Sequence, residues 1–231
     1  MSHPEHPSPA FLQAIFDLMV PIPAGEITLR NEKTQSAWSV QLQPFWMARV
    51  PVTERLFAAF CGGANSRERP VTQISWFDAL RFCNLLSEAA GMKPCYTTSG
   101  DEVLWDRTAD GFRLPTEAEW EHACRAGSTG VRYGKLEDIA WFRENSGGSV
   151  REVGLKAPNG WGLHDMIGNV WEWCWDVFDP EVYGPYRVFR GGGWFDEPRG
   201  LRASCRRKSH PTFQVDDLGF RLARSMPVES P

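Results

Sequence analysis

The chain has 231 residues, of which 42% are hydrophobic, and its 25 Lys and Arg against 29 Asp and Glu give a formal net charge of −4. A chain of this length buries enough surface to form a core without a metal or a disulfide, and its composition excludes the disordered and fibrous classes. The mild acidity removes the overall positive field that favours nucleic-acid binding, and no apolar run reaches the roughly 20 residues of a membrane-spanning helix.

The two ends of the chain are predicted to be tails. Residues 1–9 contain three prolines and no apolar periodicity, and residues 227–231 have the same character. The apolar stretch over residues 10–20 is interrupted by Gln and Asp and lacks the preceding Lys/Arg cluster of a signal peptide. The six cysteines show no CxxC pair, which favours reduced thiols. We therefore expect a cytoplasmic protein with a single domain over residues 10–226.

Three helices are predicted, each from a Ser or Thr cap followed by apolar residues at helical spacing. In the second and third, an acidic residue three places after the cap forms a capping-box pattern, and a glycine follows the last apolar residue. Cys83 and Cys124 lie on the apolar faces of these two helices, so we expect both thiols in the core. The predicted helices cover residues 53–61, 75–91 and 116–127.

Strands are predicted in the first quarter and at the end of the chain. Short alternating runs between residues 20 and 52 indicate a small antiparallel sheet, and residues 187–194 and 218–224 indicate two more strands. Residues 128–185 are mostly loop, because turn residues recur throughout them. The polar, irregular segment 195–217 is long for a loop in a compact domain, which favours a functional role for it.

Seven motifs follow one another along the chain: IPAG (22–25), PVT (51–53), RPVTQISWFDALRFCNLLSE (69–88), GFRLPTEAEWEHACRAG (111–127), NGWGLHDMIGNVWEWCWD (159–176), RVFRGGGW (187–194) and LGFRLAR (218–224). Each is weak alone, but the ordered series resembles the formylglycine-generating-enzyme, or sulfatase-modifying-factor, family. The resemblance implies an α+β fold, a variant of the C-type lectin fold. In that fold a small twisted antiparallel sheet carries a few helices and long irregular loops.

The resemblance also implies a structural calcium site in the fifth motif. Asp165 and Glu172 offer carboxylates there, while Gly168 and Val170 fall on the family's backbone-carbonyl positions. Calcium prefers six to eight oxygen ligands of this kind in an irregular loop. Without the resemblance, two acids seven residues apart would be interpreted as surface charges.

The catalytic pattern of the family is incomplete in this chain. Its active enzymes use two cysteines five residues apart between the sixth and seventh motifs, where the thiolates bind copper(I). This segment has a single cysteine, Cys205, so we expect no copper and no formylglycine generation by that mechanism. Other relatives are non-haem iron enzymes with histidine ligands, and the five histidines here show no ligand spacing. An iron-dependent oxidoreductase acting on a thiol or peptide substrate stays as the alternative.

The segment between the last two motifs combines aromatic, basic and acidic residues, as a recognition surface does. The alternative is that these charges are solvated and pair with one another, with Arg202 and Arg206 as internal struts. In the lectin-like scaffold this region is the exposed ligand-binding face. We therefore predict a non-catalytic module that binds an unidentified protein or small-molecule ligand, with neither membrane nor nucleic acid as partner. The predicted contact residues are Trp194, Phe195, Asp196, Glu197, Arg199, Arg206, Lys208, His210, Phe213 and Gln214.

Some members of the family are variable proteins of diversity-generating retroelements. Their C-terminal segment is diversified between a start and an end that resemble the last two motifs of this chain. Relatives that are not diversified share the same layout. Diversification of residues 194–217 is therefore a further hypothesis, which one sequence does not test.

Overall fold

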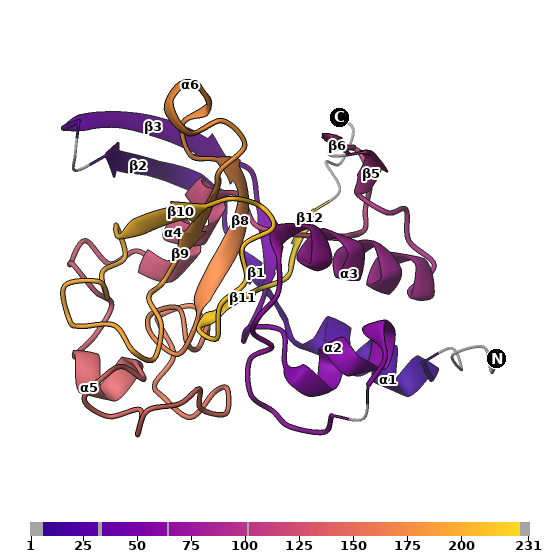
Figure 1. Ribbon diagram of the computed structural model, residues 1–231, viewed down its shortest axis with the longest axis horizontal. Coiled ribbons are helices and arrows are strands. Elements are labelled where there is room, and N and C mark those ends of the chain that lie inside the picture. The colour runs from indigo at the N-terminus through magenta and orange to yellow at the C-terminus, as the bar shows by residue number, and fades with distance from the viewer. Residues whose placement is uncertain (1–6, 32–33, 64, 101, 227–231) are drawn as a thin grey trace.

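The computed structural model describes residues 7–31, 34–63, 65–100 and 102–226. A long irregular stretch separates α5 from β8, and shorter loops join most of the other elements (Figure 1). The helices are α1 (Pro9–Asp17), α2 (Glu54–Cys61), α3 (Trp76–Ala89), α4 (Glu117–Arg125), α5 (Leu136–Ile139) and α6 (Pro180–Tyr183). The strands are β1 (Met19–Ile22), β2 (Gly25–Asn31), β3 (Ser36–Leu42), β4 (Phe45–Ala48), β5 (Tyr96–Ser99), β6 (Glu102–Trp105), β7 (Phe112–Arg113), β8 (Trp171–Val177), β9 (Arg187–Arg190), β10 (Arg206–Ser209), β11 (Leu218–Phe220) and β12 (Ala223–Ser225).

Two four-stranded sheets form the centre of the fold. One has the strand order β1-β4-β12-β7, with antiparallel pairs throughout. The other has the order β10-β9-β8-β11, in which the β8–β11 pair is parallel and the other two pairs are antiparallel. The pairs β2–β3 and β5–β6 form separate antiparallel hairpins. The predicted α+β class with a small antiparallel sheet is confirmed, and the structure adds a second four-stranded sheet that contains one parallel pair.

Strand β8 shows why one part of the sequence prediction is wrong. It lies within residues 128–185, which we expected to be mostly loop. Its first four residues, from Trp171 to Cys174, are all buried, so its burial does not alternate even though Glu172 and Asp176 alternate with the tryptophans in the sequence. A strand that is covered on both faces is hard to recognise from periodicity alone.

The three predicted helices are confirmed with their caps. Thr53 accepts a hydrogen bond from the Leu56 amide at the start of α2. The helices α3 and α4 each begin with a reciprocal capping box, in which the cap side chain and the third helical residue bond to each other's backbone amides. Cys83 and Cys124 are fully buried, which confirms the prediction of core thiols. The six cysteines are all free.

Helix α1 was not predicted, and it begins inside the predicted N-terminal tail. Ser8 caps it by accepting a hydrogen bond from the Phe11 amide, and Pro9 occupies the first helical position, where its missing N–H has no consequence. The tail prediction is therefore wrong for Ser8 and Pro9. Residues 1–6 and 227–231 lie outside the described residues.

The helices α1, α2 and α3 lie on one side of the central strands, and the β8–β10 strands with their loops lie on the other (Figure 1). Large aromatic side chains fill the core between them, and two of the buried indoles bond to backbone carbonyls. The Trp76 Nε1 donates to the Cys174 carbonyl at 2.9 Å, and the Trp173 Nε1 donates to the Ile74 carbonyl at 2.9 Å. These bonds tie β8 to the start of α3, because a buried indole N–H requires a partner.

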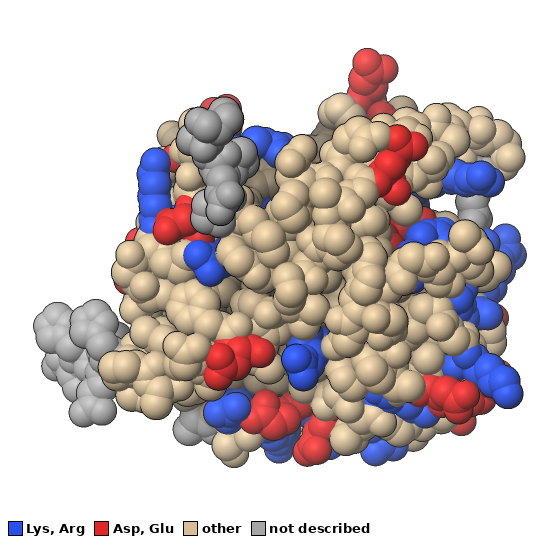
Figure 2. Space-filling view, turned by 180° about the vertical axis from the view of Figure 1, so that it is seen from behind, with Lys and Arg blue, Asp and Glu red and all other residues tan. Residues whose placement is uncertain are grey.

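The surface carries charges of both signs. On the face shown in Figure 2, Lys and Arg side chains are interspersed with Asp and Glu around a centre with few charges. Within the described ranges, no helix is both long and apolar enough to cross a bilayer.

Candidate binding surface

Three consecutive glycines, Gly191 to Gly193, lead the chain from β9 into the predicted contact segment. Gly191 and Gly192 have φ angles of 105° and 87°, in the region that favours glycine. At Gly193 a Cβ atom would stand 2.4 Å from the Asp217 Oδ2. The absence of side chains therefore lets the Asp217 carboxyl pack directly against the loop backbone.

The two residues after the glycines form an aromatic pair at the surface, in which Trp194 is half-buried and Phe195 is exposed. The ring centroids of Trp194 and Phe195 lie 5.4 Å apart at an interplanar angle of 64°, and 56% of the Phe195 surface is exposed. The Trp194 amide donates to the Asn169 carbonyl at 2.8 Å, and its Nε1 donates to the Asp216 carbonyl at 3.3 Å. Bonds to two other loops thus hold the pair in place.

Asp196 anchors this loop through hydrogen bonds to the residues beneath it in the fold. Its Oδ2 accepts hydrogen bonds from the Trp171 Nε1 at 2.6 Å and from the Gly193 amide at 2.8 Å. Its Oδ1 pairs with Arg207, whose guanidinium also lies 4.6 Å from the Trp171 ring centroid. Asp196 therefore orients the exposed loop, and its oxygens are already engaged within the protein.

Charged side chains border the aromatic pair. The Arg143 guanidinium lies 4.4 Å from the Phe195 ring centroid, and it pairs with Glu197 at 2.6 Å. Burial, together with the nearby Asp196 and Asp216 carboxylates, raises the pKa of Asp217 to about 6, against the lowering effect of Arg207. We call this group the Trp194 surface, which consists of Arg143, Trp194, Phe195, Asp196, Glu197, Arg207, Asp216 and Asp217.

The ten predicted contact residues do not gather in one place, because strand β10 divides them. Successive side chains of a strand point to opposite faces. Arg207 points to the Trp194 surface, whereas Arg206 points inward and makes two hydrogen bonds to Glu117 at 2.7 and 2.6 Å. Only 11% of the Arg206 side chain is exposed. Arg206, a predicted ligand contact, is therefore placed in its alternative role as an internal strut and is not part of the Trp194 surface.

Lys208 and His210 also lie away from the Trp194 surface. The Lys208 Nζ lies 4.0 Å from the Tyr183 ring centroid and 4.6 Å from the Phe178 ring centroid. The His210 ring lies 6.0 Å from the Tyr186 ring. These two residues belong to an aromatic group around α6, separate from the Trp194–Phe195 pair.

The remaining predicted residues lie at other positions on the surface. Phe213 is 40% exposed, and Gln214 donates to the Asp78 Oδ2 at 3.3 Å beside the start of α3. Arg199 is exposed, and its carbonyl accepts a bond from the Arg202 Nε at 2.9 Å. Of the ten predicted residues, the Trp194 surface contains four, from Trp194 to Glu197.

Four residues of the Trp194 surface are not among the ten predicted contacts: Arg143, Arg207, Asp216 and Asp217. Arg143 comes from the loop after α5, and no pattern in that loop indicates it. Arg207 could have been found, because alternation along a strand at residues 206–209 separates it from Arg206 and Lys208.

The predicted calcium ligands do not fit a cation well. The Glu172 carboxylate is fully buried and pairs with Arg221 at 2.8 Å, and it also accepts the Trp120 Nε1 at 2.7 Å. The Asp165 Oδ2 accepts the Gly154 amide at 2.7 Å, and burial raises the pKa of this carboxyl. A calcium ion at Glu172 would stand beside the Arg221 cation. Of the two predicted carboxylates, that of Glu172 is therefore occupied by Arg221 and Trp120, and only Asp165 is left to act with the backbone carbonyls of Gly168 and Val170.

The described residues do not assemble a transition-metal site either. Within them, no three His, Cys, Asp or Glu side chains form a group that could hold a metal ion. The Cys205 thiol is partly buried, which raises its pKa. The three described histidines have separate partners: the His122 Nε2 lies 3.1 Å from the Pro23 carbonyl, the His164 Nδ1 lies 2.8 Å from the Lys156 carbonyl, and the His210 Nδ1 lies 2.8 Å from the Thr212 Oγ1.

Comparison with known protein families gives a match over almost the whole chain. The sulfatase-modifying factor enzyme 1-like domain matches residues 9–226, which is nearly the whole sequence. The chain belongs to this family. The predicted resemblance is thereby confirmed, and the family match covers the glycine loop and the Trp194 surface together with both sheets.

Relatives within the sulfatase-modifying factor family carry several different names. Chaperone protein LppX of Paenibacillus barcinonensis is 29% identical over 84% of this chain and 85% of its own length. Inactive C-alpha-formylglycine-generating enzyme 2 of Bos taurus is 30% identical over 84% of this chain, but the match spans only 62% of the bovine protein. The solved structure of Treponema denticola variable protein 1 has a TM-score of 0.81 and 30% identity, and the match covers 90% of this chain and 95% of that one. The structural match confirms the predicted fold class, the C-type-lectin-like variant of the family.

Proposed function

We propose that the chain is a non-catalytic binding module whose partner is a protein that contacts the Trp194 surface. The observation that carries this proposal is the aromatic pair of exposed Phe195 and half-buried Trp194, which Asp196 holds in place and Arg143 borders. Exposed aromatic and arginine side chains on a rigid support are typical of the residues that dominate protein interfaces.

Two further observations support binding over catalysis. Only one cysteine, Cys205, lies between the last two motifs, where active enzymes of the family use two. One relative that matches 84% of the chain is described as an inactive formylglycine-generating enzyme, and another similar structure is described as a variable protein. Both descriptions are compatible with a scaffold of this family that works without the cysteine pair.

Quantitative affinity capture tests the proposal. The wild-type chain, the double variant Trp194→Ala/Phe195→Ala and the control Leu104→Ala are immobilised in equal amounts and exposed to extract from the source cells. Leu104 is 62% exposed on the β5–β6 hairpin, so the control also removes an exposed apolar side chain. We expect a protein that is retained by the wild type and by Leu104→Ala and is reduced at least tenfold with the double variant. Equal retention by all three would place the interface elsewhere.

Elemental analysis of protein purified without chelators tests the metal predictions. Because Glu172 pairs with Arg221, we expect less than one calcium per chain. About one calcium per chain would restore the predicted site at Asp165, Gly168, Val170 and Glu172. Stoichiometric iron or copper would overturn the binding module in favour of the oxidoreductase.

Diversification of the segment is a separate proposal that rests on the variable-protein likeness. It predicts a reverse-transcriptase gene beside the coding sequence, together with a near-copy of the part that encodes residues 194–217. The two copies should differ at adenines. Absence of both from the locus would leave a binding surface of fixed sequence.

A further inference from the structure

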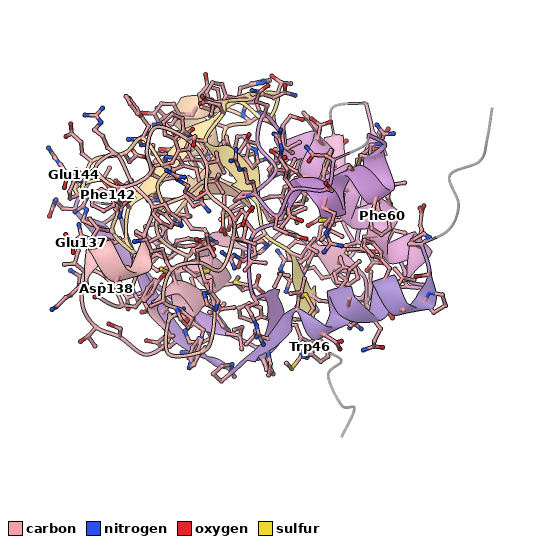
Figure 3. The ribbon with its side chains drawn as sticks, turned by 90° about the horizontal axis from the view of Figure 1, so that it is seen from below. Trp46, Phe60, Glu137, Asp138, Phe142 and Glu144 are labelled. Atoms are coloured by element: carbon pink, nitrogen blue, oxygen red, sulfur yellow. The ribbon has the colours of Figure 1, made fainter. Side chains whose placement is uncertain are left out.

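A second candidate site lies at the opposite end of the molecule from the Trp194 surface. Figure 3 shows Phe60 of α2 at the end that holds α1, whereas Phe142 and Glu144, the neighbours of Arg143, lie at the other end. At the first end, α1, the start of α2 and the loop around Val153 enclose a cavity of about 400 Å³. Its lining residues are Phe11, Ala14, Ile15, Leu18, Met19, Ala48, Val50, Pro51, Val52, Thr53, Arg55, Leu56, Glu68, Val153 and Leu222.

The cavity has the size and chemistry of a ligand site. Small-molecule sites have volumes of about 300–1,000 Å³ and mostly apolar walls with a few polar groups. Here every lining residue except Thr53, Arg55 and Glu68 is apolar. Water is poorly held between apolar walls because it finds few hydrogen-bond partners there, so an apolar ligand gains by displacing it.

The polar groups of the cavity define the head of the ligand. Arg55 donates from its Nε to the Glu68 carboxylate, and the two side chains are 51% and 44% exposed, so the pair lies at the mouth. The Thr53 hydroxyl oxygen accepts the Leu56 amide. Because Arg55 and Glu68 neutralise each other, the mouth offers hydrogen bonds without net charge. A charged head would lose hydration there without a free opposite charge.

The wall formed by α1 has few buried contacts of its own. Ile15 is the only residue of α1 that is fully buried, while Phe11 and Phe16 are partly exposed. An apolar molecule in the cavity would cover the side of α1 that Phe11, Ala14 and Leu18 present to it. Ligand binding should therefore also stabilise the packing of α1 on the domain.

We propose that this cavity binds an uncharged amphiphile, with an alkyl or aryl body between α1 and Val153 and a hydroxyl or amide head at the Arg55–Glu68 pair. An apolar cavity of about 150 Å³ takes one benzene molecule. By that measure a cavity of about 400 Å³ takes a body of roughly 16 non-hydrogen atoms. The site is independent of the Trp194 surface and of any protein partner that binds there.

Fluorescence titration with N-phenyl-1-naphthylamine, an uncharged probe that brightens in apolar surroundings, tests the proposal. In the variant Ala14→Trp, an indole is placed against the cavity from an exposed position of α1. The matched control is Ala10→Trp, another exposed position of the same helix that does not line the cavity. We expect saturable binding to the wild type and to Ala10→Trp, and at least a tenfold weaker affinity in Ala14→Trp.

A second pair of variants approaches the cavity from the opposite wall. Val153→Phe fills it from the loop, and Leu155→Phe alters an exposed position of the same loop outside it. Only Val153→Phe should weaken probe binding. Circular dichroism on all four variants checks that each is folded. Probe affinities are compared only within a pair in which both variants are folded.

Competition with three ten-carbon compounds tests the head group. Decanol should displace the probe at least fivefold more effectively than decanoate or decylammonium. Equal probe affinity in a folded cavity variant and its control, or no saturable binding to the wild type, would overturn the site. Stronger displacement by decanoate or by decylammonium would overturn the uncharged head.

Discussion

Arg206 and Arg207 are neighbours in the chain, yet their side chains differ in exposure and in partner. The Arg206 side chain is 11% exposed and bonds twice to Glu117, whereas the Arg207 side chain is 52% exposed and pairs with Asp196. Both belong to a basic stretch that, judged by composition, looks uniform. The alternation of strand β10 makes one a part of the interior and the other a part of the candidate binding surface.

The interior side of β10 belongs to a chain of buried charges. Arg190 is 1% exposed and bonds to Glu117 and Glu121 of α4, and its NH2 group also donates to the Ala203 carbonyl at 2.7 Å. Arg206 bonds to both oxygens of Glu117 and shares one of them, Oε1, with Arg190. These contacts connect α4, β9 and the loop before β10. They support the exposed loop from the interior. Within this network, every charged side chain lies beside one of opposite charge.

The largest effect should come from removing the centre of this network. Arg190→Met fills a similar volume but leaves Glu117 and Glu121 in the interior with one cationic partner each, Arg206 and Arg125. Breaking a buried ion pair from one side costs about 3–5 kcal/mol. We expect a loss of that size in the free energy of unfolding, measured by urea denaturation. A loss below about 1 kcal/mol would show that Arg190 does not hold the network together.

The comparison between the two neighbours gives the second prediction. Arg206→Ala removes two charge-assisted hydrogen bonds to Glu117 and should lower the free energy of unfolding by about 2–3 kcal/mol. Arg207→Ala removes a half-exposed pair and should lower it by less than about 1 kcal/mol. Both are measured under the same denaturant conditions, so each is the control for the other. Equal losses would contradict the division of β10 into an inner and an outer face.

Features that depend on local sequence signals could be predicted, whereas features that depend on the surrounding fold could not. The helices at Thr53, Ser75 and Thr116 were found because their caps and apolar spacing are local signals. The family and the glycine loop were found because the motifs are long and ordered. Strand β8 was missed because the turn residues that recur through 128–185 outweighed the short alternation of its tryptophans with Glu172 and Asp176.

The binding surface was predicted only in part, because it depends on contacts between distant segments. Trp194 to Glu197 could be predicted from the loop between the last two motifs. Their neighbour Arg143 comes from a segment more than 50 residues earlier, and only the fold brings it to Phe195. The pairing of Glu172 with Arg221, 49 residues later, likewise depends on the parallel contact between β8 and β11, which no local pattern indicates.

The smallest expected effect is the pH dependence of the free energy of unfolding that Asp217 of the Trp194 surface contributes. The pKa of Asp217 is raised to about 6 in the folded protein, above its unfolded value of about 3.9, so the folded state takes up this proton first as the pH falls. Stability contributed by this group therefore rises as the pH falls from 7 toward 4. Asp217→Asn should be more stable than the wild type at pH 7, by no more than about 1 kcal/mol after solvent screening, and the difference should vanish near pH 4.

Urea denaturation at pH 4, 5, 6 and 7 measures this difference. Asp217 faces the carboxylates of Asp196 and Asp216 and the guanidinium of Arg207, so the control must remove a charge of the same surface at a more exposed position. Glu197→Gln does so, since the Glu197 side chain is 68% exposed. It should give no stabilisation at pH 7 that disappears near pH 4. If Asp217→Asn and Glu197→Gln changed stability alike at every pH, the Asp217 carboxyl beside Gly193 would behave like a solvated one. The Trp194 surface would then contain no desolvated carboxyl that distinguishes it from ordinary surface.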